Sequence, residues 1–513
     1  MTEVTLDPRR WWALGAMSVS LLVVGLDLTV LNVALPTLAT DLEASTSQLQ
    51  WFANAYTLVL ASLLLPAGLL GDRFGPKRLM LGALVVFGLA SAACAFAQTP
   101  GQLIAGRAAL GVGSAFLIPL SMSLLNLLFA PEERQRAMTI WLMANSLGIP
   151  LGPVLGGWLI DHASWRAAFF INVPLAVTVL ALALRHVPES RNPQAQGRAL
   201  DWPGGSLVTL GLGGVVYALI ESPARGWADA RIATALVLGV VALAAFIVVE
   251  IRHPAPMIPL QLFRSRAFTG ANLLTLLLYA ALGGGLFFLP LNLIQVQGYS
   301  TTAAGAALLP LVVLLALLSR WSGGSIDRYG ARLPLVLGPV IAACGFALLA
   351  APGVGGTYWA TFFPALVVLG LGMAITVAPL TTTVMNSVAT SHAGAASGIN
   401  NAASRVAGVL AVALFGVVIV PVFDRSLHDR LGGADAAPAL IEAIDAQRNK
   451  LAAIALPENI DPRSRAAAER AIGEAFVTGF RWVMLVSSVL ALAGALGAWL
   501  LIGSSLAPGS AAP

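Results

Sequence analysis

Long runs of apolar residues, each ended by charged or turn-forming residues, repeat along the whole chain. A helix that crosses a bilayer needs roughly 20 mostly apolar residues, and most runs have about that length. They predict fourteen membrane-spanning helices, at 12–36, 50–71, 79–98, 102–128, 138–161, 167–187, 204–221, 230–250, 267–291, 304–322, 333–351, 357–383, 396–421 and 478–503. The pattern therefore predicts an all-α integral membrane protein.

The composition agrees with this pattern. Only 10% of the 513 residues are charged, whereas a soluble protein carries roughly 25%. Hydrophobic residues make up 58% of the chain, and the mean hydropathy is +0.84. These values exclude a soluble enzyme, a disordered chain, a disulfide scaffold and a nucleic-acid-binding domain as the main organisation.

Basic residues fall mainly in one set of loops. With the N-terminus inside, that set holds sixteen Lys and Arg, whereas the short loops of the opposite side hold three. Because cytoplasmic loops are enriched in Lys and Arg, we expect both termini in the cytoplasm. Residues 422–475 are then a long extracytoplasmic loop, either a solvated spacer or a set of short helices.

Two loops in different halves of the chain share one pattern. Residues 68–78 read GLLGDRFGPKR, and residues 323–332 read GGSIDRYGAR, at a constant offset of 255. The matched residues are Asp72 and Asp327, Arg73 and Arg328, and Gly75 and Gly330. Parallel repeats of this kind build carriers that hold substrate between two halves. We therefore predict a six-helix bundle at 1–190, a cytoplasmic linker with two inserted helices at 191–258, and a second six-helix bundle at 259–513.

One carboxylate lies deep in a predicted span. Asp27 stands 15 residues into the first helix, roughly 22 Å from its inner end. A charge in the bilayer centre costs about 2.5–3.5 kcal/mol even on insertion scales, so Asp27 must face the protein interior. Desolvation disfavours its charged form, which suits it to take up and release a proton. The alternative is an acid satisfied by neighbouring hydroxyl groups for packing alone.

Arg107 is expected at about the same depth, five residues into the fourth predicted helix. A guanidinium stays charged in proteins, so it would favour the charged form of an acid brought next to it. The alternative is a structural donor to helix carbonyls. Arg405, in the span at 396–421, is a third deep charge, for which we favour gating or packing.

A stripe of small residues marks the fifth predicted helix. Gly148, Gly152 and Gly156 fall at i, i+4 and i+8, which lets a neighbouring helix approach closely. Pro153 bends the helix, and Gly157 follows the stripe. Generic helix packing would explain the same spacing.

The repeated loops predict a conformational latch. Gly68 and Gly75 permit a tight turn, Asp72 can cap a helix, and Arg73 can reach Glu132 or Glu133. Such contacts would hold one state and break on switching. The basic residues Lys77 and Arg78 are also explained by topology alone. Glu221, at the end of the seventh predicted span, is expected to anchor that helix at the membrane–water interface.

Four segments together carry a resemblance to a known family. Residues 68–78 resemble the signature loop of the major facilitator superfamily, and Leu103–Phe116 its helix-4 arginine motif. Residues 148–157 resemble the helix-5 antiporter motif. The segment Asp27–Pro36, which includes Asn32, resembles the helix-1 motif of the fourteen-helix drug:proton antiporter branch. The likeness covers about residues 10–505.

The resemblance implies two six-helix bundles with an inserted hairpin, in a bacterial cytoplasmic (inner) membrane. It also implies proton-driven multidrug efflux of lipophilic, cationic compounds, with Asp27 as the proton-coupling acid and Arg107 in proton transfer. A lipid or metabolite carrier on the same scaffold, or a receptor without transport, is the alternative. No nucleotide loop, zinc spacing or catalytic triad occurs, so we expect neither an enzyme nor a cofactor or metal. We expect small molecules, protons and lipid as partners, no nucleic acid, and a monomer.

Overall fold

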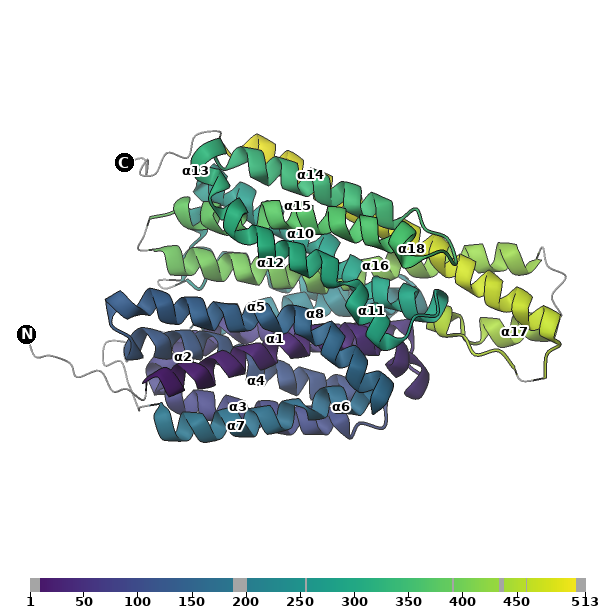
Figure 1. The fold of residues 1–513 in the computed structure, drawn as a ribbon, viewed down its shortest axis with the longest axis horizontal. Helices are drawn as coiled ribbons and strands as arrows, with labels where there is room; N and C mark the ends of the chain where they lie inside the picture. The colour runs from purple at the N-terminus through teal and green to yellow at the C-terminus, as the bar shows by residue number, and fades with distance from the viewer. Residues whose placement is uncertain are drawn as a thin grey trace, which may run out of the picture. The chain divides into compact units, whose positions relative to one another are not determined.

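Helices account for the regular structure throughout the described chain (Figure 1). The structure is a computed structural model, which describes residues 10–187, 201–253, 256–389, 392–432, 438–457 and 459–503. No strand occurs within these ranges.

Seven helices form the first part of the chain and two more follow them. They are α1 (Arg10–Asp41), α2 (Thr46–Phe74), α3 (Pro76–Ala95), α4 (Pro100–Leu128), α5 (Pro131–His162), α6 (Trp165–Phe170), α7 (Asn172–His186), α8 (Trp202–Arg225) and α9 (Ala230–Arg252). The later helices are η2 (Leu260–Arg264), α10 (Arg266–Leu291), η3 (Asn292–Val296), α11 (Thr301–Ala307), α12 (Leu309–Gly323), α13 (Ser325–Tyr329), α14 (Arg332–Leu349), α15 (Tyr358–Asn386), α16 (Ala393–Gly432), α17 (Pro438–Asp445), η5 (Arg448–Ala453) and α18 (Pro462–Leu501).

The helices bear out the predicted membrane architecture. Among the described residues, twelve helical segments are long and apolar enough to cross a membrane. The two remaining predicted spans fall on α2 and α5, which are 29 and 32 residues long. The all-α membrane fold is confirmed, and the helices are consistent with fourteen spans.

Two predicted spans are divided by a short break. The span at 167–187 consists of α6 and α7, and the span at 304–322 consists of α11 and α12. A proline follows each break, Pro174 in α7 and Pro310 in α12. Because proline has no N–H, it leaves the carbonyl four residues earlier without its helical partner. That carbonyl belongs to the last turn before each break.

The segment predicted as an extracytoplasmic loop at 422–475 contains helices beyond the predicted spans. Helix α16 continues to Gly432, and α18 already begins at Pro462, with α17 and η5 between them. The carboxylate of Asp461 caps α18 by accepting hydrogen bonds from the backbone N–H groups of Arg463 and Ser464. A hydrogen bond from the side chain of Ser464, followed by those from the backbone N–H groups, holds the pKa of Asp461 below its usual value. Apolar patterning marks the part of a helix that faces lipid, and these helices continue beyond it.

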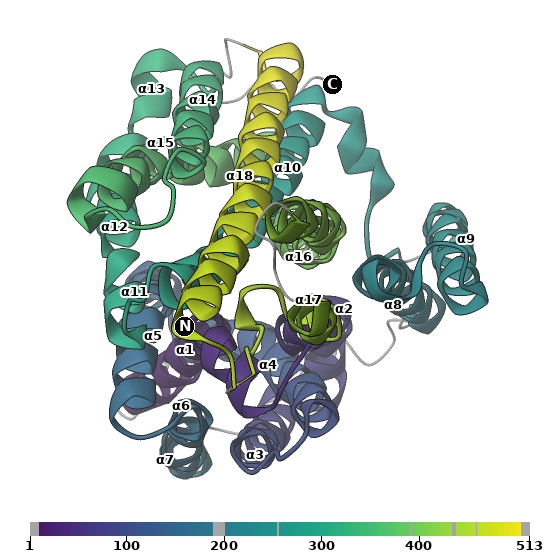
Figure 2. The ribbon, with the colours of Figure 1, turned by 90° about the vertical axis from the view of Figure 1, so that its right-hand side faces the viewer.

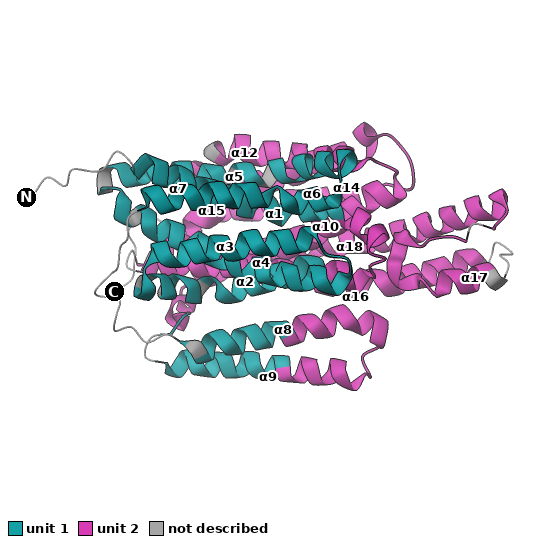
Figure 3. Cartoon of the chain, turned by 90° about the horizontal axis from the view of Figure 1, so that it is seen from below, with its two compact units in different colours: residues 1–34, 51–213, 239–257 teal, residues 35–50, 214–238, 258–513 magenta. Residues whose placement is uncertain are grey.

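The described helices form two compact units (Figure 3). Unit 1 comprises 1–34, 51–213 and 239–257, and unit 2 comprises 35–50, 214–238 and 258–513. Within unit 1, α3 packs against α4 and α7. Within unit 2, α18 packs against α10, α14 and α16 (Figure 2). The predicted domain bounds stay a prediction, and residues 191–200, at the start of the predicted linker, lie outside the described residues.

Candidate functional site

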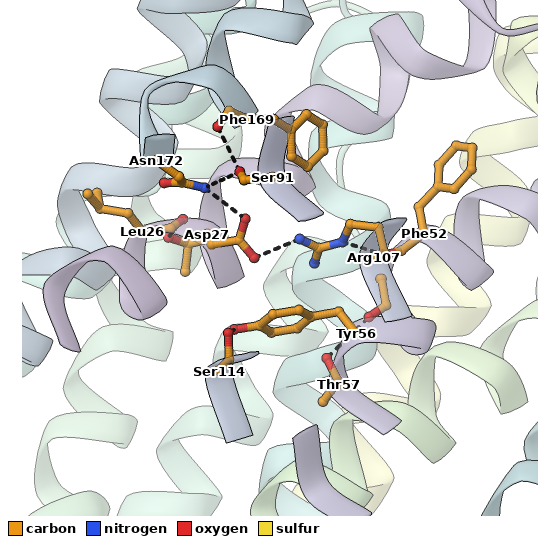
Figure 4. A network of polar contacts seen from close by, with 12 residues as sticks. Leu26, Asp27, Phe52, Tyr56, Thr57, Ser91, Arg107, Ser114, Phe169 and Asn172 are labelled. Carbon is orange, nitrogen blue, oxygen red and sulfur yellow. Dashed lines mark hydrogen bonds and ion pairs between the residues drawn. The ribbon is translucent and has the colours of Figure 1, made fainter. Parts of the chain in front are cut away.

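A buried ion pair joins two helices of unit 1 (Figure 4). Arg107 on α4 donates from Nη1 to Oδ2 of Asp27 on α1 at 2.7 Å. Their side chains are 1% and 2% exposed. The structure therefore brings together the two deep charges that the sequence predicted at one depth.

Helix α2 holds the guanidinium of Arg107 on two sides. Its Nε donates to the backbone oxygen of Phe52 at 3.0 Å. Its Cζ lies 4.4 Å from the ring centroid of Tyr56, within the range of a cation–π contact. Tyr56 is itself fixed, because its hydroxyl donates to Oγ of Ser114 on α4 at 2.9 Å. An ion pair, a carbonyl and an aromatic ring thus hold one guanidinium.

The second oxygen of Asp27 has a partner that sequence reasoning missed. Asn172, at the start of α7, donates from Nδ2 to Oδ1 of Asp27 at 3.2 Å and to Oγ of Ser91 on α3 at 3.2 Å. The hydroxyl of Ser91 donates to the backbone oxygen of Phe169 at 2.8 Å. The one available signal was an amide side chain inside an apolar run, the kind of residue that bonds between membrane helices.

The glycine stripe of α5 packs against α1 around Asp27. A Cβ at Gly148 would lie 2.8 Å from the oxygen of Leu22, one at Gly152 would overlap the hydroxyl of Thr29, and one at Gly156 would lie 2.9 Å from Cγ1 of Val30. The contacted residues occupy the turns of α1 before and after the carboxylate. Pro153 and Gly157 are buried on the same helix. The stripe therefore brings the two backbones together beside the ion pair.

Each of the two repeated loops contains one glycine with a positive φ. Gly75 has φ of +97° between α2 and α3, and Gly330 has φ of +72° between α13 and α14. Only glycine adopts this region freely. Gly68 lies inside α2, where a Cβ would meet Pro119 at an ordinary 3.6 Å. The first turn therefore depends on Gly75 and not on Gly68.

The predicted latch residues have varied partners. Glu133 accepts two hydrogen bonds from Arg10, at 3.0 and 3.1 Å, and the expected pair of Arg73 with Glu132 or Glu133 stays a prediction. The guanidinium of Arg73 lies 5.6 Å from the ring centroid of Phe74, and Arg328 lies 5.4 Å from that of Tyr329. Lys77 donates to the oxygen of Leu184 at 3.2 Å, and Arg78 lies in the first turn of α3. The side chains of Asp72, Glu132 and Asp327 lie outside what the structure describes.

The secondary candidates lie on α1, α8 and α16. Glu221 pairs with Arg225 one turn further along α8, at 3.2 Å. Asn32 on α1 and Arg405 on α16 are half-buried. No group of three His, Cys, Asp or Glu that could hold a metal ion occurs among the described residues.

Known proteins resemble this chain over most of its length. Residues 17–412 match the family model of the Major Facilitator Superfamily. The tetracenomycin C resistance and export protein of Streptomyces glaucescens is 31% identical over 495 residues, which cover 95% of this chain and 90% of that protein. The puromycin resistance protein of Streptomyces alboniger is 37% identical over 418 residues, covering 80% and 82%.

A solved structure shares the fold. A bacterial homologue of the human lysosomal transporter Spinster has a TM-score of 0.68 at 16% identity, covering 98% of this chain and 99% of that one. At this identity the likeness shows the fold alone. The family match and the curated relatives settle the family: the chain belongs to the Major Facilitator Superfamily and is a membrane transporter rather than an enzyme.

Proposed function

We propose that this transporter is a proton-coupled antiporter that exports lipophilic, cationic drugs or biocides across the cytoplasmic membrane by alternating access. The relatives named for antibiotic resistance and export support the drug class. The observation that carries the coupling is the buried Asp27–Arg107 pair, because ionised side chains within a membrane protein mark ion and substrate pathways.

The pair can couple proton and substrate through one carboxylate. Arg107 keeps its charge, so a proton that enters the pair must bind Asp27. Protonation neutralises the carboxylate and removes its attraction for Arg107, which keeps its contacts with Phe52 and Tyr56. A lipophilic cation needs the same carboxylate in its charged form. Proton and cation therefore alternate on Asp27, and the proton gradient drives export without a cofactor.

The orientation in the membrane follows from the distribution of basic residues. Both termini lie in the cytoplasm, because sixteen Lys and Arg against three favour that side. Protons then enter from outside, and substrate leaves in the opposite direction.

Ethidium efflux from expressing cells tests the proposal. We expect wild-type cells to expel ethidium until a proton uncoupler is added. Asp27→Asn keeps the size of the side chain and removes its charge, so efflux should fall to the level of cells without the transporter. Asp41→Asn is the matched control, because Asp41 is exposed at the end of the same helix, and it should retain wild-type efflux.

Two results would contradict the proposal. Full uncoupler-sensitive efflux by Asp27→Asn would remove this residue from coupling. Absence of efflux for a whole panel of cationic dyes and biocides, with normal amounts of protein in the membrane, would favour a lipid or metabolite carrier.

A further inference from the structure

Asn172 on α7 belongs to one buried polar cluster with Asp27 on α1, Arg107 on α4 and Ser91 on α3. The proposed coupling gives Asn172 no role. It is 1% exposed. Its Nδ2 group is shared between Oδ1 of Asp27 and Oγ of Ser91, at 3.2 Å each. The carboxylate therefore receives a guanidinium on one oxygen and an amide on the other (Figure 4).

The surrounding hydrogen bonds fix the direction of this amide. Ser91 donates its own proton to the oxygen of Phe169 at 2.8 Å, so its Oγ offers a lone pair to Asn172. A reversed amide would point its oxygen at that lone pair and at the carboxylate of Asp27. Both are acceptors, and two acceptors repel each other. Ser91 therefore keeps the N–H groups of Asn172 directed at Asp27.

The two hydrogen-bond donors to Asp27, one on each oxygen, favour the charged carboxylate. Hydrogen bonds that are donated to a carboxylate stabilise its charged form, and bonds to a charged group are stronger than neutral ones. We infer that Asn172 is a positioning residue of the proton site, which holds the Asp27 carboxylate toward Arg107 in its charged form. This inference rests on the proposed role of Asp27 in coupling.

Other charged and titratable groups near Asp27 also influence its protonation, apart from the hydrogen bond of Asn172. Arg107 on α4 is the charged partner, and Tyr56 on α2 lies beneath its guanidinium. Cys94 on α3 is close enough to interact with the charges of both Asp27 and Arg107. Helix α5 faces this part of α1 through its glycine stripe, which carries no titratable group. Asn172, on α7, is uncharged, so it acts on Asp27 only through its hydrogen bond.

Infrared spectroscopy reads the protonation of Asp27 directly. The full chain is reconstituted in lipid and titrated with acid, and the carboxyl band absent from Asp27→Asn is assigned to Asp27. In Asn172→Leu, which removes the donor at nearly constant volume, we expect the titration midpoint to rise by about one pH unit. Asn172→Gln keeps an amide and should restore part of the wild-type midpoint. Ser91→Ala, which frees the amide to turn, should move it in the same direction as Asn172→Leu.

A buried asparagine elsewhere provides the control. Asn272 on α10 donates to the oxygen of Phe268 at 2.9 Å and accepts from Asn400 at 3.2 Å. Asn272→Leu should leave the Asp27 midpoint unchanged.

The outcomes separate this inference from the proposed function. A wild-type midpoint in both Asn172→Leu and Ser91→Ala overturns the inference, whatever efflux shows. If Asn172→Leu does not fold, Ser91→Ala and Asn172→Gln decide by the same midpoint. Full efflux by Asp27→Asn overturns the proposed function, even where Asn172 shifts the midpoint.

Discussion

At the scale of single residues, the contacts of Arg107 explain why an arginine is needed there. Its Nη1 donates to Asp27, its Nε donates to Phe52, and its plane lies by the ring of Tyr56. A guanidinium has five N–H donors in a planar fork, whereas lysine offers one point charge. Lysine therefore cannot replace all three contacts at once.

The ion pair gives a stability prediction at this scale. Arg107→Leu leaves the buried carboxylate of Asp27 without its charge partner, and breaking such a pair costs about 3–5 kcal/mol. We expect a clear fall in the free energy of unfolding, measured by thermal unfolding in detergent. Replacing both Asp27 and Arg107 by Leu removes both charges and should recover most of that loss. A double variant at least as unstable as Arg107→Leu would contradict this account.

The sequence revealed the charged members of this site but not the neutral ones. Asp27 and Arg107 were recognisable because charge is costly in a membrane span. Ser91 and Asn172 were missed because uncharged polar residues occur in many spans, and their meaning depends on which helices are neighbours. The partners of Asp27 come from residues 80 and 145 positions away, and only the fold brings them together.

At the scale of helices, the contact of α5 with α1 places the proton site. Gly148, Gly152 and Gly156 leave no room for a side chain where α5 meets α1. The glycine spacing predicted this close approach, although it could not name the partner helix. The predicted spans at 396–421 and 478–503 are shorter than helices α16 and α18. Hydropathy follows the contact of a helix with lipid and does not report how far its backbone hydrogen bonds continue.

A larger side chain in the stripe should separate the two helices. In Gly152→Val the new atoms overlap the hydroxyl of Thr29, and overpacking of this kind costs about 1–3 kcal/mol. We expect a lower unfolding temperature and a loss of most efflux, because Asp27 moves with α1. Gly15→Ala is the control, because a Cβ at Gly15 meets nothing within 4 Å. Wild-type efflux by Gly152→Val would show that this packing is not required.

At the scale of the whole molecule, the sequence predicted the membrane class, and the family follows from known relatives. Apolar runs gave the helices because lipid imposes one length and one character on every span. The pattern shared by two loops at an offset of 255 residues is visible in the sequence alone, and the duplication of two halves stays a prediction from it. The route of substrate and proton depends on how the transporter changes conformation, which a pattern of residues does not define.

Proton movement driven by substrate shows whether this transporter couples the export of ethidium to protons. The transporter is reconstituted in proteoliposomes that enclose a pH-sensitive dye, with ethidium added on one side and no other gradient. We expect wild type to move protons against the flow of ethidium, and we expect an uncoupler to abolish this signal. Asp27→Asn should move none, while Asp41→Asn behaves as wild type. Proton movement of wild-type size in Asp27→Asn, or ethidium transport by wild type without any proton movement, would contradict the account.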